Sequence, residues 1–344
     1  MSAQQKIVRT LMRLPAPVLR RMSKGAVLNV DGREIDPGIG FLTAQAGKGP
    51  AMETLTPAEA RQATRDGFAM MNAARSKDAG VTDLTIPGPG GAMAARHYWP
   101  TSATPNKALL VYFHMGGCVI GDLDACDSFC SHIAAKTGTG VISVEYRMAP
   151  EHVFPAAADD AIAAFRWVRD HSTEFGGTPD MVGVGGDSAG GMLAAIVAQE
   201  MKRAGETSPN VQLLIYPWVN MTADGGTMIS CGDCAPLNTS TMRWFERLYM
   251  PADADKTSPK ASPGLVEDLS GLPRALVYTA GFDPLRDQGE AFAKRLEQAG
   301  VPVTFREYGD MPHGFTAMGG VSKRAAAVAD EIIDDLASAF QAAS

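Results

Sequence analysis

The alternation of apolar runs with amphipathic helical patterns constrains the fold of this chain more than any other feature of its sequence. Several of the strand-like segments are continuous apolar runs, as expected of strands that are buried on both faces of a sheet. The segments are 84–86, 94–98, 108–113, 141–146, 181–185, 211–216, 275–279 and 304–308. The helical patterns between and after them are 123–137, 155–173, 189–204, 285–299 and 321–342. This alternation predicts an α/β fold with a mostly parallel, eight-stranded sheet that has helices on both faces.

Two segments depart from the alternation. Residues 1–50 have a helical pattern with irregular joins, and residues 219–260 are rich in Met, Thr, Gly and Pro around a short helical stretch at 240–250. An insertion in an open α/β sheet usually overhangs the carboxyl ends of the strands, where ligands bind. A further helix is predicted from Thr56 to about Ser76, because a Thr cap is followed by proline in the first turn and by glutamate three residues after the cap.

The charge distribution excludes one class of partner and leaves another open. The chain of 344 residues carries a net charge of −7, and an acidic surface repels phosphate backbones, so nucleic acid is not expected as a partner. The first 25 residues nevertheless hold six cations and no acid, with apolar residues at helical spacing. Such a helix could target the chain or lie on a membrane surface, but packing on the protein body is the preferred interpretation. No apolar run is long enough for a signal-peptide core or a membrane span, so we expect a cytoplasmic protein without stable membrane association.

The five cysteines indicate reduced thiols, because an odd number in a long chain does not suit a disulfide framework. Cys126 and Cys130 form one close pair, and Cys231 and Cys234 form another with C-x-x-C spacing. A four-thiolate zinc site is conceivable, but two half-sites so far apart in sequence favour unligated thiols. We expect neither a metal nor a cofactor.

Residues 186–190 read Gly-Asp-Ser-Ala-Gly, a G-x-S-x-G pentapeptide that stands where a buried strand ends and an Ala-rich helix begins. The turn from strand to helix is so tight that the residues two before and two after the serine must lack bulk. Ser188 Oγ is then exposed above the sheet, and the helix amino end behind it favours developing negative charge. A glycine-rich turn that only connects two elements is the alternative. The flanking strand and helix favour a nucleophile.

A nucleophilic serine needs a base to take its proton and a third group to orient that base. On this architecture the partners follow in the order Ser, Asp or Glu, His, each just after a late strand. Asp283 and His313 occupy these positions. Asp287 is expected inside the next helix, and Asp310 is too close in sequence to His313 to lie on a neighbouring strand end. Four of the remaining histidines are interpreted as structural, namely His97, His132, His152 and His171.

The loop after the third main strand, residues 114–122, reads His-Met-Gly-Gly-Cys-Val-Ile-Gly-Asp. Acyl transfer builds negative charge on a carbonyl oxygen, and preorganised backbone N–H groups stabilise it. One donor should be the amide of Ala189, and the others should come from this loop, whose glycines let the backbone approach a substrate. His114 is expected to brace the loop by hydrogen bonds without transferring a proton.

Together these segments resemble the bacterial hormone-sensitive lipase family of esterases. That family carries an H-G-G-G loop upstream of G-D-S-A-G, followed by D-P-L-x-D and H-x-F. The similar segments here are 114–117, 186–190, 283–287 and 313–315, and residues 145–151 and 154–157 resemble the family's Y-R-L-A-P-E and F-P-A-A segments. The resemblance spans about residues 55–320, and its motifs are jointly highly specific.

The resemblance implies an α/β-hydrolase fold with a helical cap and a cofactor-free hydrolase of short- to medium-chain carboxylic esters. It implies a triad of Ser188, Asp283 and His313, with oxyanion donors at the amides of Gly116, Gly117 and Ala189. Glu145 and Arg147 would be structural, and a homodimer is plausible by resemblance alone. The cap would comprise residues 1–50 and an insertion at 219–250, and the catalytic domain would comprise 51–218 and 251–344.

Two residues depart from the family pattern. Met115 replaces the first glycine of the loop, and would be strained if that position needs a positive φ. Because the family's donors correspond to the next two glycines, we expect the oxyanion hole to survive, with the Met115 side chain turned away from the reacting carbon. Cys118 stands where the family often has a bulky aromatic residue, which predicts a wider pocket; Cys118 as the nucleophile is the alternative. We expect these two residues, with His114 and Asp187, to support the loop and the substrate pocket.

The prediction is therefore a serine carboxylesterase whose partners are a small ester and water. Two alternatives remain open. The same triad could act on an amide, lactone, thioester or carbamate. The chain could also be a ligand receptor on a retired hydrolase scaffold, although such receptors lose the catalytic histidine, which is present here as His313.

Overall fold

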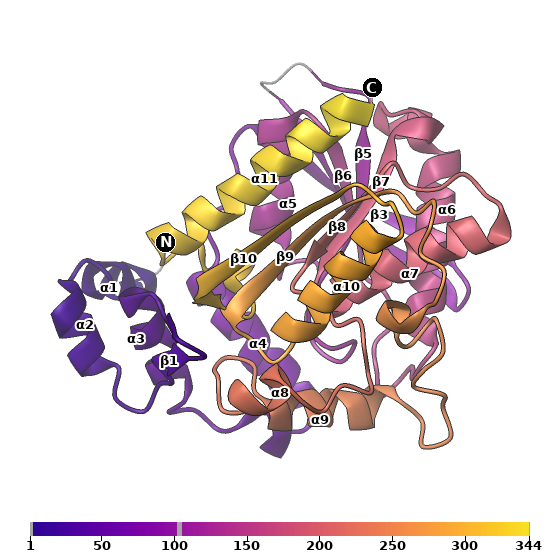
Figure 1. The fold of residues 1–344 in the computed structure, drawn as a ribbon. Helices are drawn as coiled ribbons and strands as arrows, with labels where there is room; N and C mark the ends of the chain where they lie inside the picture. The colour runs from indigo at the N-terminus through magenta and orange to yellow at the C-terminus, as the bar shows by residue number, and fades with distance from the viewer. Residues whose placement is uncertain (1–2, 102–104, 344) are drawn as a thin grey trace.

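An eight-stranded sheet forms the centre of the structure, a computed structural model that describes residues 3–101 and 105–343 (Figure 1). The strand order is β10-β9-β8-β7-β5-β6-β4-β3; β4 is antiparallel to both of its neighbours, and the other pairs are parallel. The strands are β3 (Ala79–Gly88), β4 (Gly91–Pro100), β5 (Leu109–Phe113), β6 (Gly140–Val144), β7 (Val182–Asp187), β8 (Val211–Ile215), β9 (Arg274–Phe282) and β10 (Val303–Pro312). The predicted α/β fold with a mostly parallel, eight-stranded sheet is confirmed.

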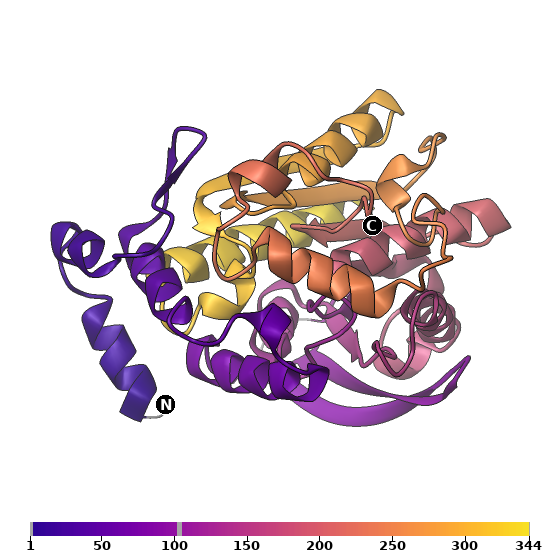
Figure 2. The same ribbon diagram turned by 90° about the horizontal axis from the view of Figure 1, so that it is seen from below.

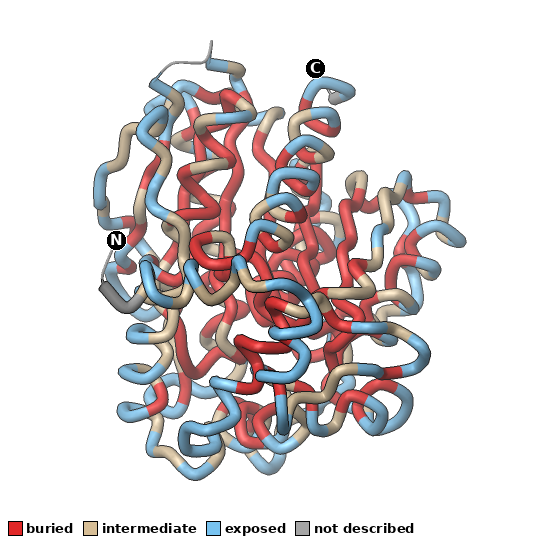
Figure 3. The backbone as a smooth tube through the Cα atoms, turned by 90° about the vertical axis from the view of Figure 1, so that its left-hand side faces the viewer, coloured by how far each residue is buried: buried red, intermediate tan, exposed pale blue. Residues whose placement is uncertain are grey.

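The central strands are buried along their whole length, as their continuous apolar runs predict. Every residue of β5, β6, β7 and β8 is buried, whereas only one residue of the edge strand β3 is buried. Parallel strands need cover on both faces, because each face presents apolar side chains. Figure 3 shows the buried residues concentrated along the sheet and on the helix sides that face it.

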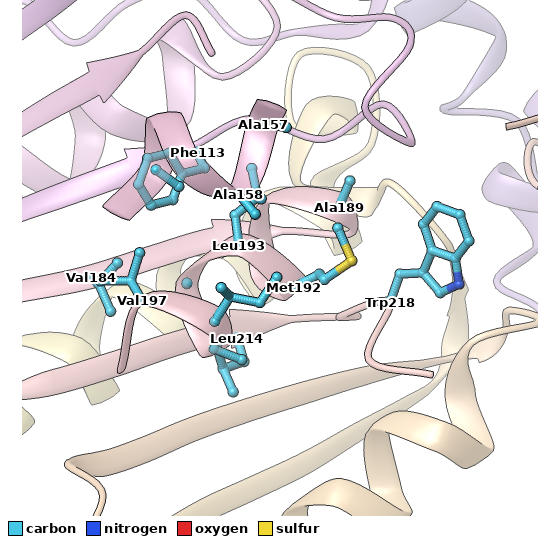
Figure 4. Close-up of a cluster of buried hydrophobic side chains, with 14 of the residues drawn as sticks. Phe113, Ala157, Ala158, Val184, Ala189, Met192, Leu193, Val197, Leu214 and Trp218 are labelled. Atoms are coloured by element: carbon cyan, nitrogen blue, oxygen red, sulfur yellow. The ribbon is translucent and has the colours of Figure 1, made fainter. Parts of the chain in front are cut away.

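Helices cover the two faces of the sheet in separate groups. α6 (Ala156–Asp170), α7 (Ala189–Ala204) and α10 (Arg286–Gln298) contribute to one apolar core. α5 (Asp127–Thr137) and α11 (Lys323–Ala343) contribute to the other. In Figure 4, Leu193 and Val197 of α7 lie in one cluster with Val184 of β7 and Leu214 of β8. This cluster fixes the helix that begins directly after residue 188 against the middle of the sheet.

The described part of the N-terminal segment, residues 3–50, is helical as predicted, and it also contains a hairpin that was not predicted. The helices are α1 (Ala3–Leu11), α2 (Ala16–Met22) and α3 (Pro37–Ala46), and the hairpin pairs β1 (Asn29–Val30) with β2 (Arg33–Glu34). Its turn residues Asp31 and Gly32 have φ of 52° and 78°, the conformation for which Asp-Gly is favoured in two-residue hairpins. Figure 2 shows this segment at one side of the molecule, outside the sheet.

The predicted helix after Thr56 is present as α4 (Pro57–Met71), with both hydrogen bonds of the capping box. It ends five residues earlier than Ser76. Its C-cap residue Asn72 is extended, with φ −60° and ψ 145°, and the Asn72 side chain donates to the Ala125 carbonyl at 3.1 Å. The helix therefore ends at Met71, where Asn72 makes a tertiary hydrogen bond and does not continue the helix.

The insertion after β8 forms α8 (Thr227–Ser230) and α9 (Thr239–Tyr249). Figures 1 and 2 show both helices across the end of the sheet at which β9 and β10 terminate. Ser230 Oγ of α8 donates to Asp31 Oδ2 at 2.9 Å, and Arg286 Nη2 donates to the same oxygen at 2.6 Å. The N-terminal hairpin, the insertion and the start of α10 are thereby joined at one carboxylate.

Within the described ranges 3–101 and 105–343, no helix is both long and apolar enough to cross a membrane.

The packing of α7 generates a stability prediction. Leu193 has no exposed surface, so Leu193→Ala should lower the free energy of unfolding by about 2–5 kcal/mol through lost burial and a residual cavity. Ile229 on α8 is 73% exposed, and Ile229→Ala should change the free energy of unfolding by no more than about 0.5 kcal/mol. Urea denaturation followed by circular dichroism measures both. Equal losses in the two variants would contradict the assignment of the core.

Candidate active site

Ser188 occupies a sharp turn between β7 and α7. Its φ of 58° and ψ of −118° are unusual for a residue with a side chain. A Cβ at Gly190 would lie 1.9 Å from the Phe113 carbonyl oxygen, and one at Gly186 would lie 2.4 Å from the Gly190 carbonyl carbon. Backbone contacts therefore exclude a side chain at Gly186 and at Gly190, two residues before and two residues after the serine. This steric requirement was predicted from the G-x-S-x-G spacing.

The structure brings together the three residues predicted as the nucleophile, the base and the carboxylate that orients the base. His313 Nε2 lies 2.9 Å from Ser188 Oγ, and His313 Nδ1 lies 2.7 Å from Asp283 Oδ2. Asp283 follows β9 and His313 follows β10, so the ends of three parallel strands supply the three groups. Asp283 is fully buried, and Ser188 and His313 are each 6% exposed. The Asp283 carboxylate accepts a hydrogen bond from His313 Nδ1–H, which leaves Nε2 unprotonated and able to accept the hydrogen of the serine hydroxyl.

The competing carboxylates and histidines have other partners. Asp287 accepts from the Thr227 amide at 3.0 Å, and Asp310 forms an ion pair with Arg324 at 2.7 Å. His132 Nδ1 and His171 Nδ1 each bond a carbonyl one helical turn earlier, at 2.8 and 2.9 Å. None of these four residues takes part in the hydrogen bonds of Ser188 or His313.

The loop after β5 has the backbone conformation that its glycines permit. Gly116 and Gly117 have φ of 125° and 61°. A Cβ at Gly116 would lie 1.9 Å from the Ile120 carbonyl oxygen, and one at Gly117 would lie 2.3 Å from the Phe245 ring of α9. Among the described residues, the amides of Gly116 and Gly117 donate to no acceptor. The Ala189 amide is at the first position of α7, where a helix offers no acceptor of its own. All three amides are therefore available to an external oxygen.

The His114 side chain contacts the strand end and the loop on either side of it. Its ring stacks on Tyr146 at 4.3 Å between centroids, and the Tyr146 hydroxyl donates to the His114 carbonyl at 2.8 Å. His114 Nδ1 lies 2.7 Å from the Met115 carbonyl, which fixes Nδ1 as the donor. The side chain is fully buried and has no hydrogen bond to the three catalytic candidates.

Met115 is not strained, because it does not have a positive φ. Its side chain is 8% exposed, and its sulfur lies 3.9 Å from the point where a Cβ on Gly314 would stand. The methionine therefore packs toward the turn that follows His313. The glycine that it replaces is not required at this position by backbone conformation.

Cys118 is buried without exposed surface and faces the Tyr249 hydroxyl at the end of α9. The structure therefore gives no support to a pocket widened by its small side chain. Burial raises the pKa of the Cys118 thiol to about 12, which disfavours the thiolate that a cysteine nucleophile needs.

The four remaining cysteines are also buried free thiols. Cys126 Sγ contacts Ser143 Oγ at 3.2 Å, and Cys231 Sγ contacts the Gly281 carbonyl at 3.8 Å. Within the part of the chain that the structure describes, no group of three or more His, Cys, Asp or Glu side chains is placed to hold a metal ion. The conceivable four-thiolate zinc site is not assembled there.

Asp187, the residue before Ser188, is buried, and the hydroxyl groups of Tyr112, Tyr216 and Thr316 lie within 3.2 Å of its carboxylate oxygens. Asp187 was predicted among the supporting residues, whereas Tyr216 and Thr316 were not. Their positions, directly after β8 and three residues after His313, are the signal that could have identified them.

Comparison with known proteins identifies the family to which the chain belongs. Residues 110–317 match a family described as alpha/beta hydrolase fold. The carboxylic ester hydrolase LipN of Mycobacterium tuberculosis is 40% identical over 341 residues, which cover 96% of this chain and 89% of that protein. The ethyl acetate hydrolase of Pseudomonas putida is 35% identical over 284 residues, covering 81% of this chain and 89% of that protein.

Similar solved structures also include ester hydrolases. An ester hydrolase from the metagenome of Lake Arreo has a TM-score of 0.83 at 39% identity, covering 87% of this chain and 95% of that one. The thermostable carboxylesterase EstE1 from a metagenomic library has a TM-score of 0.78 at 35% identity, covering 83% of this chain and 98% of that one.

The glycine contacts predict opposite effects for two Gly→Ala variants. Gly190→Ala should prevent correct folding of the turn, because the new Cβ would collide with the backbone of Phe113. Gly67 lies inside α4 with no atom within 4 Å of its Cβ position, so Gly67→Ala should stabilise the protein by about 0.5–1 kcal/mol. Melting temperatures and soluble yields test the pair. A stable, soluble Gly190→Ala variant would refute the close approach.

The burial of Cys118 predicts its reactivity. In folded protein at pH 8, iodoacetamide should leave Cys118 unmodified, because its thiol is inaccessible and remains protonated. After denaturation the same thiol should react, and peptide mass spectrometry can quantify both states. Stoichiometric alkylation of Cys118 in the folded protein would contradict this description.

Proposed function

The chain belongs to the α/β-hydrolase-fold family, in its hormone-sensitive lipase branch, and on that premise we propose that it is a serine carboxylesterase acting on short- to medium-chain esters. The observation that carries the proposal is the continuous hydrogen-bond chain from Ser188 Oγ through His313 to Asp283, with separations of 2.9 and 2.7 Å. A serine hydroxyl is a weak nucleophile, and this arrangement supplies both a base and a group that orients the base.

The first half of the proposed reaction acylates the serine. Ser188 Oγ attacks the ester carbonyl carbon while His313 Nε2 takes the hydroxyl proton. The carbonyl oxygen becomes an oxyanion, and the amides of Gly116, Gly117 and Ala189 donate hydrogen bonds to it; each such donor contributes about 2.7–4 kcal/mol in transition-state stabilisation. The oxyanion then collapses, the bond to the alcohol oxygen breaks, and His313 gives its proton to the departing alcohol.

The second half releases the acid. Water enters the place of the alcohol, His313 takes one of its protons, and the resulting hydroxide attacks the acyl-enzyme carbonyl. Collapse returns the proton to Ser188 Oγ and frees the carboxylic acid. Asp283 remains ionised throughout, since its role is to hold the imidazole tautomer and to stabilise the imidazolium. No cofactor or metal enters these steps.

We propose that residues 1–50 and 219–250 form a cap over the catalytic domain, which comprises 51–218 and 251–344. Two contacts support this division. Phe245 of α9 packs on Gly117 of the oxyanion loop, and Asp31 of the N-terminal hairpin binds both α8 and Arg286. Because both segments reach residues beside the reactive groups, they would form the walls of the substrate site.

The reactants, the cellular location and the oligomeric state are also proposals. The substrate is a small ester and the second reactant is water. The net charge of −7 disfavours nucleic acid, and we propose a cytoplasmic protein without stable membrane association that can form a homodimer.

The rival reactions differ in the bond that is cleaved. An amide, lactone, thioester or carbamate could pass through the same tetrahedral intermediate. A non-catalytic receptor is disfavoured by the hydrogen bond between Ser188 and His313, because a receptor has no need to maintain a base at the nucleophile. Rates on an ester and an amide with the same acyl group would separate the bond classes.

Removal of the nucleophile tests the proposal. Ser188→Ala should lower kcat on p-nitrophenyl butyrate by roughly 10⁴-fold or more, with an unchanged fold by circular dichroism. Asp283→Asn should cause a loss of about 10⁴-fold, because the imidazole would adopt the wrong tautomer. Wild-type turnover by Ser188→Ala would disprove the assignment. Profiling p-nitrophenyl esters of increasing acyl length should place the optimum among short to medium chains.

A further inference from the structure

Asp187 is a buried carboxylate that the proposed reaction does not use. It is the last residue of β7, it directly precedes Ser188, and it is only 1% exposed. Burial raises the pKa of this carboxyl group, because a charged group is poorly solvated inside a protein. Burying a carboxylate at such a position costs folding free energy unless hydrogen-bond donors surround it.

Three hydroxyl groups from three separate segments surround it. The Tyr112 hydroxyl of β5 donates to Oδ1 at 3.0 Å. The Tyr216 hydroxyl and Thr316 Oγ1 lie 3.1 and 3.2 Å from Oδ2, and the two hydroxyl oxygens are 2.5 Å apart. Tyr112 fixes the carboxylate to the sheet, while the other two residues come from the ends of later strands.

Counting hydrogens shows how the three oxygens must be linked. The hydroxyls of Tyr216 and Thr316 carry one hydrogen each, and their separation of 2.5 Å requires one to donate to the other. The remaining hydrogen then points to Asp187 Oδ2. If either hydroxyl is removed, the other can still donate to the carboxylate directly. Loss of one hydroxyl should therefore leave the carboxylate satisfied while it breaks one route of the network.

Both hydroxyl residues contact the segment that carries the base. Thr316 is three residues after His313, in the short 3-10 helix η5 (Phe315–Met318). The Tyr216 ring lies 4.6 Å from the His313 ring, measured between centroids. Tyr216 also has a φ of 36°, a conformation that persists only when surrounding contacts enforce it. The network therefore contacts the His313 ring through Tyr216 and the turn after His313 through Thr316.

We propose that Asp187 is a positioning residue for His313, whose carboxylate, acting through the hydroxyls of Thr316 and Tyr216, sets the distance between the base and the nucleophile. The proposal rests on the proposed function, since it assumes that His313 is the base for Ser188. Asp283 fixes the tautomer and the rotation of the imidazole. Asp187 is covalently linked to Ser188 and is hydrogen-bonded to Thr316 in the turn after His313. It therefore fixes the distance between Ser188 Oγ and His313 Nε2.

The test compares Thr316→Val with Thr316→Ser. Valine keeps the shape of threonine but lacks the hydroxyl, whereas serine keeps the hydroxyl. Thr316→Val should lower kcat on p-nitrophenyl butyrate by about tenfold or more with KM changed by less than about threefold, because a base displaced by a fraction of an ångström affects the transition state and not substrate binding. Thr316→Ser should restore most of the turnover. Each kcat is expressed per active site titrated with a p-nitrophenyl phosphonate, so an unfolded fraction cannot mimic the effect.

A matched control comes from the neighbouring strand. Thr279 of β9 is also fully buried, and its hydroxyl has no hydrogen-bond partner among the described residues. Thr279→Val removes a buried hydroxyl of the same kind outside the network, and kcat per titrated site should stay at the wild-type value.

A double-mutant cycle tests whether Thr316 acts through Asp187. Asp187→Asn should itself lower kcat, and Thr316→Val should then cost less than about threefold when it is added to Asp187→Asn, since the route is already broken. Tyr216→Phe, which keeps the ring against His313, should lower kcat in the same direction as Thr316→Val. If Asp187→Asn fails to fold, the Thr316 pair and Tyr216→Phe still decide the question.

The outcomes separate this inference from the proposed function. If wild-type protein is not labelled at Ser188 by the phosphonate, the proposed function fails and the inference fails with it. If labelling is normal but Thr316→Val turns over at the wild-type rate per titrated site, only the inference fails. A loss that Thr316→Ser does not restore, or an equal loss in Thr279→Val, would likewise overturn it.

Discussion

The contact between Gly190 and the end of β5 is the constraint on which the site depends. The missing side chain of Gly190 lets the start of α7 approach the carbonyls of Phe113 and His114, at distances where a Cβ would stand 1.9 and 2.9 Å away. Those carbonyls belong to the last residue of β5 and to the first residue of the loop 114–122. One backbone contact therefore holds the start of α7, next to Ser188, against the beginning of the loop that contains Gly116 and Gly117. Since β7 pairs with β5 on one side and with β8 on the other, the sheet keeps this contact in register.

Three further strand ends complete the site around that contact. β9 ends before Asp283, β10 ends before His313, and β8 ends before Tyr216, so residues distant in sequence converge at one edge of a parallel sheet. Asp283 and Asp187 approach the same histidine from different sides, the first through the ring nitrogen and the second through the following turn. On the proposed mechanism, Asp283 selects the tautomer and orientation of the imidazole, and Asp187 sets the distance of the imidazole from Ser188.

Much of this arrangement could be predicted from the sequence because the relevant signals are local. Apolar runs identified the strands, and the glycines at positions 186 and 190 identified the turn. Strand-end placement and chain order then selected Asp283 and His313. The hairpin at Asp31 and Gly32 also had a local signal, the Asp-Gly dipeptide, which the helical interpretation of residues 1–50 overlooked.

The remaining features depend on contacts between distant segments, which spacing does not encode. The early end of α4 at Met71 follows from contacts of Asn72 with Ala125, and the burial of Cys118 follows from α9. The network of Asp187 joins residues 112, 216 and 316, and no two of them share a motif. Met115 packs toward Gly314, and only the assembled strand ends determine that direction.

The most direct test of the central claim is a crystal structure of the protein after reaction with a p-nitrophenyl alkylphosphonate, a mimic of the tetrahedral intermediate. The account predicts phosphorus bonded to Ser188 Oγ and a phosphonyl oxygen within about 3.1 Å of the amides of Gly116, Gly117 and Ala189. His313 Nε2 should face the position of the leaving group. A phosphonate bound to another residue, or a phosphonyl oxygen directed away from these amides, would contradict it.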